Sequence, residues 1–337
     1  MFNKFKRLKI IFLSVILAFL LLVIPLFTPP THAKVNYFIS GNPENIDSKL
    51  QGFAYNIGGG GPDVDSAIQW MINQVRGCEN CNQKVDVVVI RDSGDDGYNE
   101  AILKMNGVDS VETLVISNRQ DANNPQAITA IKNAEVIFFA GGDQCNYLRN
   151  FRNTNVDKAV KSVIDRGGAV GGTSAGAMIQ SDFVFNACSN TVTSENALSN
   201  PYEDIDLNRY FLTWKNLENT IIDTHFYERD RMGRLMTFVA RLIRDGNSEQ
   251  VLGIGVDEET SVIINKDGLA EVLGEGYAYF VLGNHQPEKC EPQTPLTFTD
   301  YQVWKIGGGE SFNLKNYPTT GYQRVSVERG ELLSDPY

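Results

Sequence analysis

AVGGTSAGAMI, residues 169–179, joins a short apolar run to a helix-forming run through glycines and other small residues. The first half is typical of a buried strand, and a helix is expected from Ala175 onward. Small residues on both sides let the chain turn sharply and hold the hydroxyl of Ser174 exposed at the end of the strand, facing the free N–H groups of the helix. The segment therefore predicts a strand–turn–helix unit with a nucleophilic serine at the turn.

The same alternation of strand and helix recurs through the first half of the chain. We expect strands at Gly52–Ile57, Val85–Ile90, Val111–Ser117, Glu135–Ala140 and Gly168–Gly172. We expect helices at Val64–Val75, Asn99–Met105, Pro125–Asn133 and Val156–Asp165. Continuous apolarity indicates strands covered on both faces, so the pattern predicts a doubly wound, mostly parallel α/β sheet whose ligands bind at the carboxyl ends of the strands.

The pattern changes to hairpins after Leu252. Strands are expected at Ser261–Asn265, Ala270–Leu273, Tyr277–Val281 and Tyr301–Ile306, the last of which should close the domain. These are C-terminal β-hairpin additions to the sheet, and we interpret residues 34–337 as a single α/β domain.

The N-terminus predicts export. Four basic residues precede a long apolar run that ends in Thr31-His32-Ala33, which is typical of a signal peptide over residues 1–33. The run is also near the lower limit of a membrane span, so an uncleaved anchor stays an alternative. The expected location is secreted or periplasmic.

Net charge and cysteine spacing exclude several classes of function. The chain has 30 basic and 41 acidic residues, and removal of residues 1–33 takes away four basic ones, which leaves 26 basic residues and a net charge of −15. Nucleic acid and anionic membrane surfaces are therefore not expected partners. Of five cysteines only Cys78 and Cys81 are closely spaced, and no second pair completes a zinc site. No metal or cofactor is predicted; a Cys78–Cys81 bridge or a longer-range bridge is compatible with export.

Two histidines beyond residue 33 compete for the role of the base. His225 ends the predicted strand that contains Ile221 and Ile222, which in a parallel sheet would put it on the same edge as Ser174. His285 lies in a Pro-rich loop. An α/β-hydrolase order would use Ser174, Asp257 and His285. We prefer Ser174, His225 and an acid among Asp257, Glu258 and Glu259, because that set uses three strand ends. If the strand continues, Glu258 lies on the face opposite Asp257 and Glu259.

Four segments resemble the serine peptidases that include cyanophycinase and the bacterial α-aspartyl dipeptidase. They occur in the family's order between about residues 52 and 283, and the arginine spacing after His225 resembles the cyanophycinase branch. The segments are Phe139–Gln144, Gly171–Ala177, Asp223–His225 with Arg229, Arg231 and Arg234 behind it, and Gly253–Thr260.

The resemblance implies a fold related to the class I glutamine amidotransferases, with serine in place of their cysteine. It implies a triad of Ser174, His225 and Glu258, and an oxyanion hole of Ala175 with Gly142 or Asp143. It also implies substrate binding by Gln144, Asp223, Thr224, Arg229, Arg231 and Arg234. From the residues alone, the arginines could instead pair with Glu228 and Asp230 on a solvated face.

The chain departs from the family pattern in two places. The glycine run at 58–61 lacks the acidic pair expected after the first strand, and it does not fit a phosphate-binding fingerprint. The segment 186–218 is long and lies near the expected active-site edge, so it bears on substrate preference.

The predicted function is an exported serine exopeptidase that releases β-Asp-Arg dipeptides from cyanophycin, a polyaspartate carrying arginine on its side-chain carboxylates. Arginines suit such a substrate because a guanidinium binds a carboxylate bidentately. The alternatives are an α-aspartyl dipeptidase or other small-peptide hydrolase, and a non-catalytic exported binding protein of the same fold. The expected partner is an Asp- and Arg-rich peptide or polyamide, with membrane contact only through an uncleaved N-terminal segment. A homodimer is left open.

Overall fold

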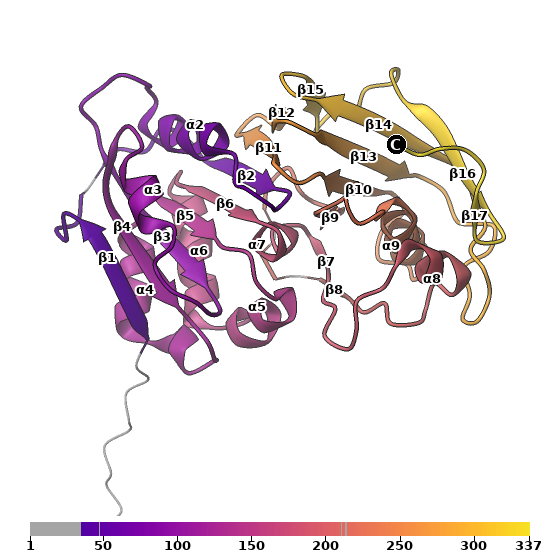
Figure 1. Cartoon of the computed structure of the whole chain (residues 1–337), viewed down its shortest axis with the longest axis horizontal. Coiled ribbons are helices and arrows are strands. Elements are labelled where there is room, and N and C mark those ends of the chain that lie inside the picture. Colours follow the sequence, from indigo (N-terminus) through magenta and orange to yellow (C-terminus); the bar gives the residue numbers. More distant parts are fainter. Residues whose placement is uncertain (1–34, 47, 210, 213) are drawn as a thin grey trace, which may run out of the picture. The chain divides into compact units, whose positions relative to one another are not determined.

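Two β-sheets organise the computed structural model, which describes residues 35–337 except residues 47, 210 and 213 (Figure 1). The predicted signal peptide or anchor, residues 1–33, lies outside the described residues. Within the described residues, no helix is both long enough and apolar enough to cross a membrane.

The first sheet has nine strands with a parallel centre. Its order is β1 (Asn36–Gly41), β4 (Val108–Val115), β3 (Val85–Arg91), β5 (Val136–Phe139), β6 (Ala169–Thr173), β2 (Ala54–Gly58), β11 (Thr260–Asn265), β12 (Leu269–Gly274) and β15 (Ser311–Asn313). The strands from β4 to β2 in this order run parallel, whereas β1 and the strands from β11 onward pair antiparallel.

Helices cover both faces of the parallel centre. On one face α2 (Asp65–Arg76) and α3 (Asn99–Leu103) pack apolar side chains against Val87 and Phe138. On the other, α4 (Pro125–Asn133) and α6 (Asn155–Asp165) pack against a cluster that contains Val88 and Phe139. The prediction of a doubly wound, mostly parallel α/β sheet with C-terminal hairpin additions is therefore confirmed.

The second sheet has eight strands and is mostly antiparallel. Its order is β17 (Glu331–Leu332), β16 (Gln323–Glu328), β14 (Phe298–Gly307), β13 (Tyr277–Gly283), β10 (Val251–Val256), β9 (Thr220–Asp223), β7 (Phe183–Phe185) and β8 (Leu207–Arg209). Helices α8 (Ser194–Ser199) and α9 (Met232–Arg244) pack against each other, and α9 packs on β10 and β13. The expectation that the strand at Tyr301–Ile306 closes the domain is wrong, because β15, β16 and β17 follow it.

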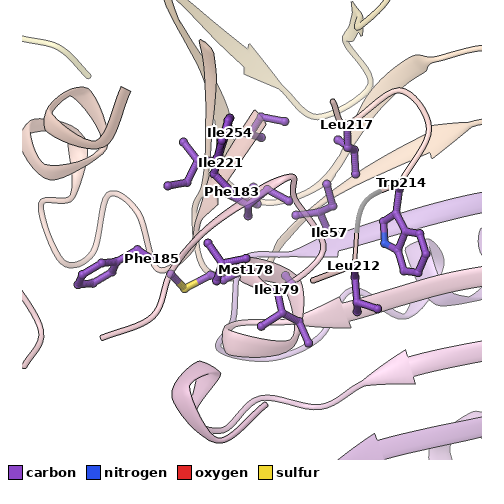
Figure 2. Packing of buried hydrophobic residues seen from close by; sticks show 14 of the residues in the cluster. Ile57, Met178, Ile179, Phe183, Phe185, Leu212, Trp214, Leu217, Ile221 and Ile254 are labelled. Atoms are coloured by element: carbon purple, nitrogen blue, oxygen red, sulfur yellow. The ribbon is translucent and has the colours of Figure 1, made fainter. Parts of the chain in front are cut away.

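One hydrophobic cluster joins the two sheets. It includes Ile57 of β2, Met178 of the short helix α7 (Ala175–Met178), and Ile221 and Ile254 of the second sheet (Figure 2). Burying an aliphatic or aromatic side chain of this size contributes about 1.5–3 kcal/mol. The shared core fixes the end of β6 against the end of β9, and these are the two strand ends that carry Ser174 and His225.

Two disulfides are present among the described residues. Cys78 bonds Cys81, and Cys145 at the start of α5 (Gln144–Phe151) bonds Cys188 in the loop after β7, while Cys290 is free and buried. A short 3₁₀ helix, η2 (Asp121–Asn123), precedes α4.

Candidate active site

Ser174 lies on a sharp turn between β6 and α7. Its backbone has φ 53° and ψ −124°, which a non-glycine residue adopts at a cost of about 1–3 kcal/mol and only when its surroundings hold it. Its N–H donates to the carbonyl of Gly58 on β2 at 3.0 Å. A Cβ at Gly176 would lie 2.3 Å from the carbonyl oxygen of Phe139, so the close approach behind the serine requires a glycine. The predicted strand–turn–helix unit is thus present, with the serine at its apex.

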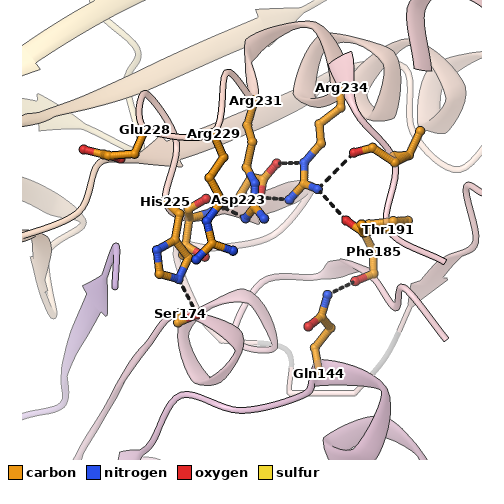
Figure 3. Close-up of polar contacts among 12 residues, drawn as sticks. Gln144, Ser174, Phe185, Thr191, Asp223, His225, Glu228, Arg229, Arg231 and Arg234 are labelled. Carbon is orange, nitrogen blue, oxygen red and sulfur yellow. Dashed lines mark hydrogen bonds and ion pairs between the residues drawn. The ribbon is translucent and has the colours of Figure 1, made fainter. Parts of the chain in front are cut away.

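His225 reaches Ser174 from the end of β9. Its Nε2 lies 2.8 Å from the Oγ of Ser174 (Figure 3). The residue has φ 46°, is buried, and donates its backbone N–H to Gly59 O at 2.7 Å. The other candidate base, His285, instead contacts the carbonyl oxygens of Gln286 and Thr299 at 2.9 and 3.0 Å. The structure therefore brings Ser174 together with His225.

Glu258 completes a continuous chain of hydrogen bonds. Its Oε1 lies 2.5 Å from Nδ1 of His225. Because a carboxylate only accepts, Nδ1 carries the proton and Nε2 is left to accept from the serine hydroxyl. This is the tautomer that a general base beside a serine needs.

Asp257 and Glu259, the two neighbours of Glu258, make other contacts. The carboxylate of Asp257 accepts the backbone N–H groups of Tyr227 and Tyr277, both at 3.0 Å, and so braces the His225 loop against β13. Glu259 has φ 52° and donates its backbone N–H to Gly60 O. Strand β10 ends at Val256, so side-chain alternation along a strand does not decide which acid reaches the histidine.

The expectation that one parallel sheet aligns Ser174 and His225 is corrected. Ser174 ends β6 of the first sheet, whereas His225 ends β9 of the second, and Glu258 lies in the turn where the chain passes from β10 of the second sheet to β11 of the first. Sequence reasoning identified three strand ends but assigned them to one sheet, because apolar runs do not reveal which strands pair.

The glycine run at 58–61 links these parts. A Cβ at Gly60, which has φ 101°, would lie 2.2 Å from Cε1 of His225, so the imidazole rests directly on the glycine backbone. Gly59 accepts a backbone hydrogen bond from His225, and Gly60 accepts one from Glu259. The run therefore supports the histidine and the turn that carries Glu258, a role that its composition alone did not reveal.

The pKa of His225 is lowered from its ordinary value of 6.5. Burial is the main cause, and the charges of Arg229 and Arg231 act in the same direction, while the hydrogen bond to Glu258 opposes them. Because its pKa is lowered, the imidazole stays neutral at lower pH than a free histidine does, and there it can still accept a proton.

We expect kcat/KM to show an acid limb below pH 6.5, because a protonated His225 cannot take the proton of Ser174. Asp257, whose pKa burial raises to about 6, titrates in the same range. The pH–rate profile of Asp257→Asn shows which of the two groups causes the acid limb. If His225 causes it, the pH of the limb in this variant should equal that of wild type. Arg229→Gln should move it upward, because it removes a charge that lowers the histidine pKa. A wild-type limb above pH 7 would contradict this assignment.

The predicted oxyanion-hole residue Ala175 directly follows Ser174, and Gly142 and Asp143 follow Gly141, which lies beside the serine. A Cβ at Gly141 would lie 3.6 Å from the Cβ of Ser174, so the 141–143 loop passes beside the nucleophile. Gly142 packs against the carboxylate of Asp92, and Asp143 caps α5 by accepting the N–H of Cys145 at 2.8 Å. Ala175 is the first residue of α7, a position whose N–H has no partner within a helix. Their backbone N–H groups stay the predicted oxyanion donors.

Gln144 and Arg229 are the predicted substrate-binding side chains that reach the surface of the site. Gln144 is partly exposed and donates from Nε2 to the carbonyl of Phe185 at 3.5 Å (Figure 3). The side chain of Arg229 is 53% exposed and its guanidinium lies 4.0 Å from the carboxylate of Glu258. Both remain candidates for direct substrate contact.

Asp223 and Arg234, both predicted to bind substrate, form a buried ion pair. The carboxylate of Asp223 is fully buried and accepts two hydrogen bonds from Arg234, at 2.6 and 2.7 Å. Arg234 is 3% exposed and also donates to Thr191 Oγ1 and to the carbonyl of Val192. With these partners, the pair joins the 191–192 segment to the end of β9, and substrate binding by Asp223 and Arg234 stays a prediction.

Arg231, which is partly exposed, and the buried Thr224 lie beside this ion pair. Arg231 donates to the carbonyl of Thr224 at 2.7 Å and lies 3.3 Å from Asp223, and burial lowers its pKa to about 10. Thr224 is fully buried, and substrate contact by its side chain stays a prediction. The alternative that the arginines pair with Glu228 and Asp230 is not found among the described residues, where Arg229 lies near Glu258 and the other two arginines pair with Asp223. Glu228 accepts the backbone N–H of Glu258 at 3.1 Å.

Comparison with known proteins assigns the chain to a family. Residues 95–272, which contain Ser174, His225 and Glu258, match the model of peptidase family S51. The chain belongs to peptidase family S51. This S51 chain is a serine peptidase, and the predicted family resemblance is confirmed; the non-catalytic alternative is not supported.

Two relatives of this S51 peptidase are cyanophycinases. The cyanophycinase of Trichormus variabilis is 28% identical over 234 residues, which are 68% of this chain and 71% of that protein. The cyanophycinase of Geminocystis herdmanii is 25% identical over 63% of this chain and 74% of that protein. A crystal structure of a peptidase from an acI-B1 Actinobacterium covers 79% of this chain and 98% of its own with a TM-score of 0.54 and 17% identity, which shows a shared fold.

Proposed function

We propose that this S51 peptidase hydrolyses an Asp- and Arg-rich polyamide of the cyanophycin type, releasing β-Asp-Arg dipeptides through a Ser174–His225–Glu258 triad. The observation that carries the proposal is the pair of hydrogen bonds that joins Ser174 Oγ to Nε2 of His225 at 2.8 Å and Nδ1 of His225 to Glu258 at 2.5 Å. Relatives named cyanophycinase support the substrate class.

The proposed chemistry is acyl transfer. Ser174 Oγ attacks the scissile carbonyl carbon while Nε2 of His225 takes the hydroxyl proton, and Glu258 stabilises the resulting imidazolium. The N–H of Ala175, with that of Gly142 or Asp143, stabilises the oxyanion. His225 then returns its proton to the leaving amine, and water hydrolyses the acyl-enzyme by the same proton path.

Charge near the triad favours an acidic group on the substrate. Arg229 is exposed, and its guanidinium is 4.0 Å from Glu258. A planar guanidinium binds a carboxylate bidentately, so Arg229 would hold an aspartyl carboxylate beside the serine. The long segment 186–218 contacts the buried Arg234 through Thr191 and Val192, and in the proposal this segment influences substrate preference.

Export is part of the proposal. The signal-like residues 1–33 support it, and so do the two disulfides, because disulfides persist in oxidising compartments. In this proposal the enzyme meets its polymer outside the cytoplasm.

The substrate is tested by incubating the purified protein separately with cyanophycin and with α-aspartyl dipeptides, and identifying the products by mass spectrometry. Release of β-Asp-Arg from cyanophycin is expected. Cleavage of the α-aspartyl dipeptides with cyanophycin left intact would contradict the proposed substrate and support the small-peptide hydrolase alternative.

We expect Glu258→Gln to keep the fold and lose about two to four orders of magnitude in turnover, because an amide neither fixes the tautomer nor stabilises the imidazolium. Glu259→Gln should be nearly silent. Asp257→Asn should mainly lower thermal stability, since Asp257 binds backbone N–H groups and not the histidine. Turnover and melting temperature measured side by side decide the matter. A largest loss in turnover at Asp257 or Glu259 would overturn the role of Glu258.

A further inference from the structure

The loop that carries His225 needs support from outside itself. It runs from His225 to Arg231 between β9 and α9, and both His225 and Asp230 adopt positive φ, at 46° and 47°. Such residues cost about 1–3 kcal/mol each unless their surroundings hold them. At the start of the loop, the backbone N–H of His225 donates to the carbonyl of Gly59, and the backbone N–H of Tyr227 donates to the carboxylate of Asp257.

Tyr337 holds the other end of the loop. Helix α9 begins at Met232, and its N-cap residue, Arg231, makes no side-chain capping bond. The N–H of Met232 instead donates to the hydroxyl of Tyr337 at 3.0 Å, and that hydroxyl donates to Oδ1 of Asp230, also at 3.0 Å. The hydroxyl, which lies more than 100 residues away in sequence, therefore satisfies the free N–H of the first residue of α9, while the hydroxyl of Ser194 accepts the N–H of Arg234 at 3.1 Å.

The ring of Tyr337 packs against the residues directly after the histidine. Its centroid lies 6.1 Å from that of Phe226 and 5.2 Å from that of Tyr227, both in edge-to-face geometry, and 5.6 Å from that of Tyr279 on β13. Burial raises the pKa of the Tyr337 hydroxyl, so the proton donated to Asp230 is retained. Aromatic pairs in this geometry stabilise by about 0.5–1.5 kcal/mol beyond the area they bury.

We propose that Tyr337 is a positioning residue for catalysis, which fixes the His225 loop so that the imidazole stays aligned between Ser174 and Glu258. The proposal rests on the proposed serine mechanism. Tyr337 acts through Phe226, Tyr227, Asp230 and Met232 and touches no reacting atom. Small displacements of a catalytic group reduce rate steeply, by about 10²-fold for 1 Å, so a loosened loop should slow the chemical step while leaving substrate binding largely intact.

The test uses the full chain and compares Tyr337→Phe, which removes only the hydroxyl, with Tyr337→Ala, which also removes the ring. Tyr322→Phe and Tyr322→Ala are the matched controls, because Tyr322 is also partly buried and packs on Trp304 of β14. Active sites are first titrated with a fluorophosphonate. The readouts per titrated site are kcat and KM on cyanophycin and the rate of Ser174 phosphonylation.

For Tyr337→Phe we expect kcat and the phosphonylation rate to fall about threefold to tenfold, in line with the loss of one or two hydrogen bonds. For Tyr337→Ala we expect a fall of about 30- to 100-fold, with KM within about twofold of wild type in both variants. The Tyr322 variants should stay within about twofold in rate.

Wild-type rates per titrated site in both Tyr337 variants would overturn the inference. A loss confined to the melting temperature or to the fraction of active sites would also overturn it, because Tyr337 would then serve only the fold. A wild-type protein that is phosphonylated but leaves cyanophycin intact contradicts the proposed substrate, and the phosphonylation rates then still test Tyr337. A wild-type protein that does not react with the phosphonate removes the serine mechanism and this inference together.

Discussion

Ser174→Ala is expected to abolish hydrolysis, with a loss in turnover of about 10⁴- to 10⁶-fold, and to leave the fold intact. Alanine keeps the Cβ and meets the same backbone strain at φ 53° as serine, so the turn between β6 and α7 has no reason to change. Only the hydroxyl that lies 2.8 Å from His225 is lost.

A matched control for this variant is Ser199→Ala. Ser199 lies on α8 and its hydroxyl donates only to the carbonyl of Asn196. Turnover should be unchanged in the control, and melting temperatures should agree with wild type in both. Activity of Ser174→Ala within tenfold of wild type would contradict the serine mechanism.

His225→Ala is expected to match the loss in Ser174→Ala, because the members of a triad act as a unit. For the same reason the double variant should be no less active than either single variant. His285→Ala is the control: it removes contacts to the carbonyls of Gln286 and Thr299 and the packing on Phe298, so it should lower stability while turnover stays near wild type. A large loss in turnover at His285 with activity retained at His225 would favour the α/β-hydrolase order.

The parallel half of the fold could be predicted from the sequence because its signals are local. The expected strand at Val85–Ile90 is β3 at Val85–Arg91, and the expected helix at Pro125–Asn133 has the same bounds as α4. In both cases the apolar pattern and the flanking residues specify the element without reference to its neighbours.

Strand pairing and short elements could not be predicted in the same way. The second sheet contains β7 and β8, of three residues each, and an apolar run does not state which sheet it joins. Strand β16 has only Val325 and Val327 as buried apolar residues, alternating with polar ones, so the C-terminal segment gave a weak signal.

The candidate site shows the same division. Ser174 and His225 were found because each follows an apolar run, and Glu258 was selected from three consecutive acids by the family resemblance. The structure brings the three side chains together. The sequence did not show that Asp223 and Arg234 form a buried ion pair, because a buried ion pair and a substrate-binding pair use the same residue types. Burial and the bidentate geometry distinguish them, and both are tertiary properties.

Contacts between segments that are far apart in the sequence were the hardest feature to predict from the sequence. The sequence hinted at a special backbone through the glycine run at 58–61, but only the fold shows that the imidazole of His225 rests on Gly60. Nothing near Tyr337 indicates that its hydroxyl caps α9, because the partner N–H belongs to Met232.

The most direct test of the central claim is to react the wild-type protein with a fluorophosphonate, digest it and map the adduct by mass spectrometry. We expect one adduct, on the peptide that contains Ser174, formed rapidly in the wild-type protein and at a strongly reduced rate in His225→Ala and Glu258→Gln. An adduct on a different serine, or an equal rate of labelling at Ser174 in all three proteins, would contradict the assignment of Ser174, His225 and Glu258 as a catalytic triad.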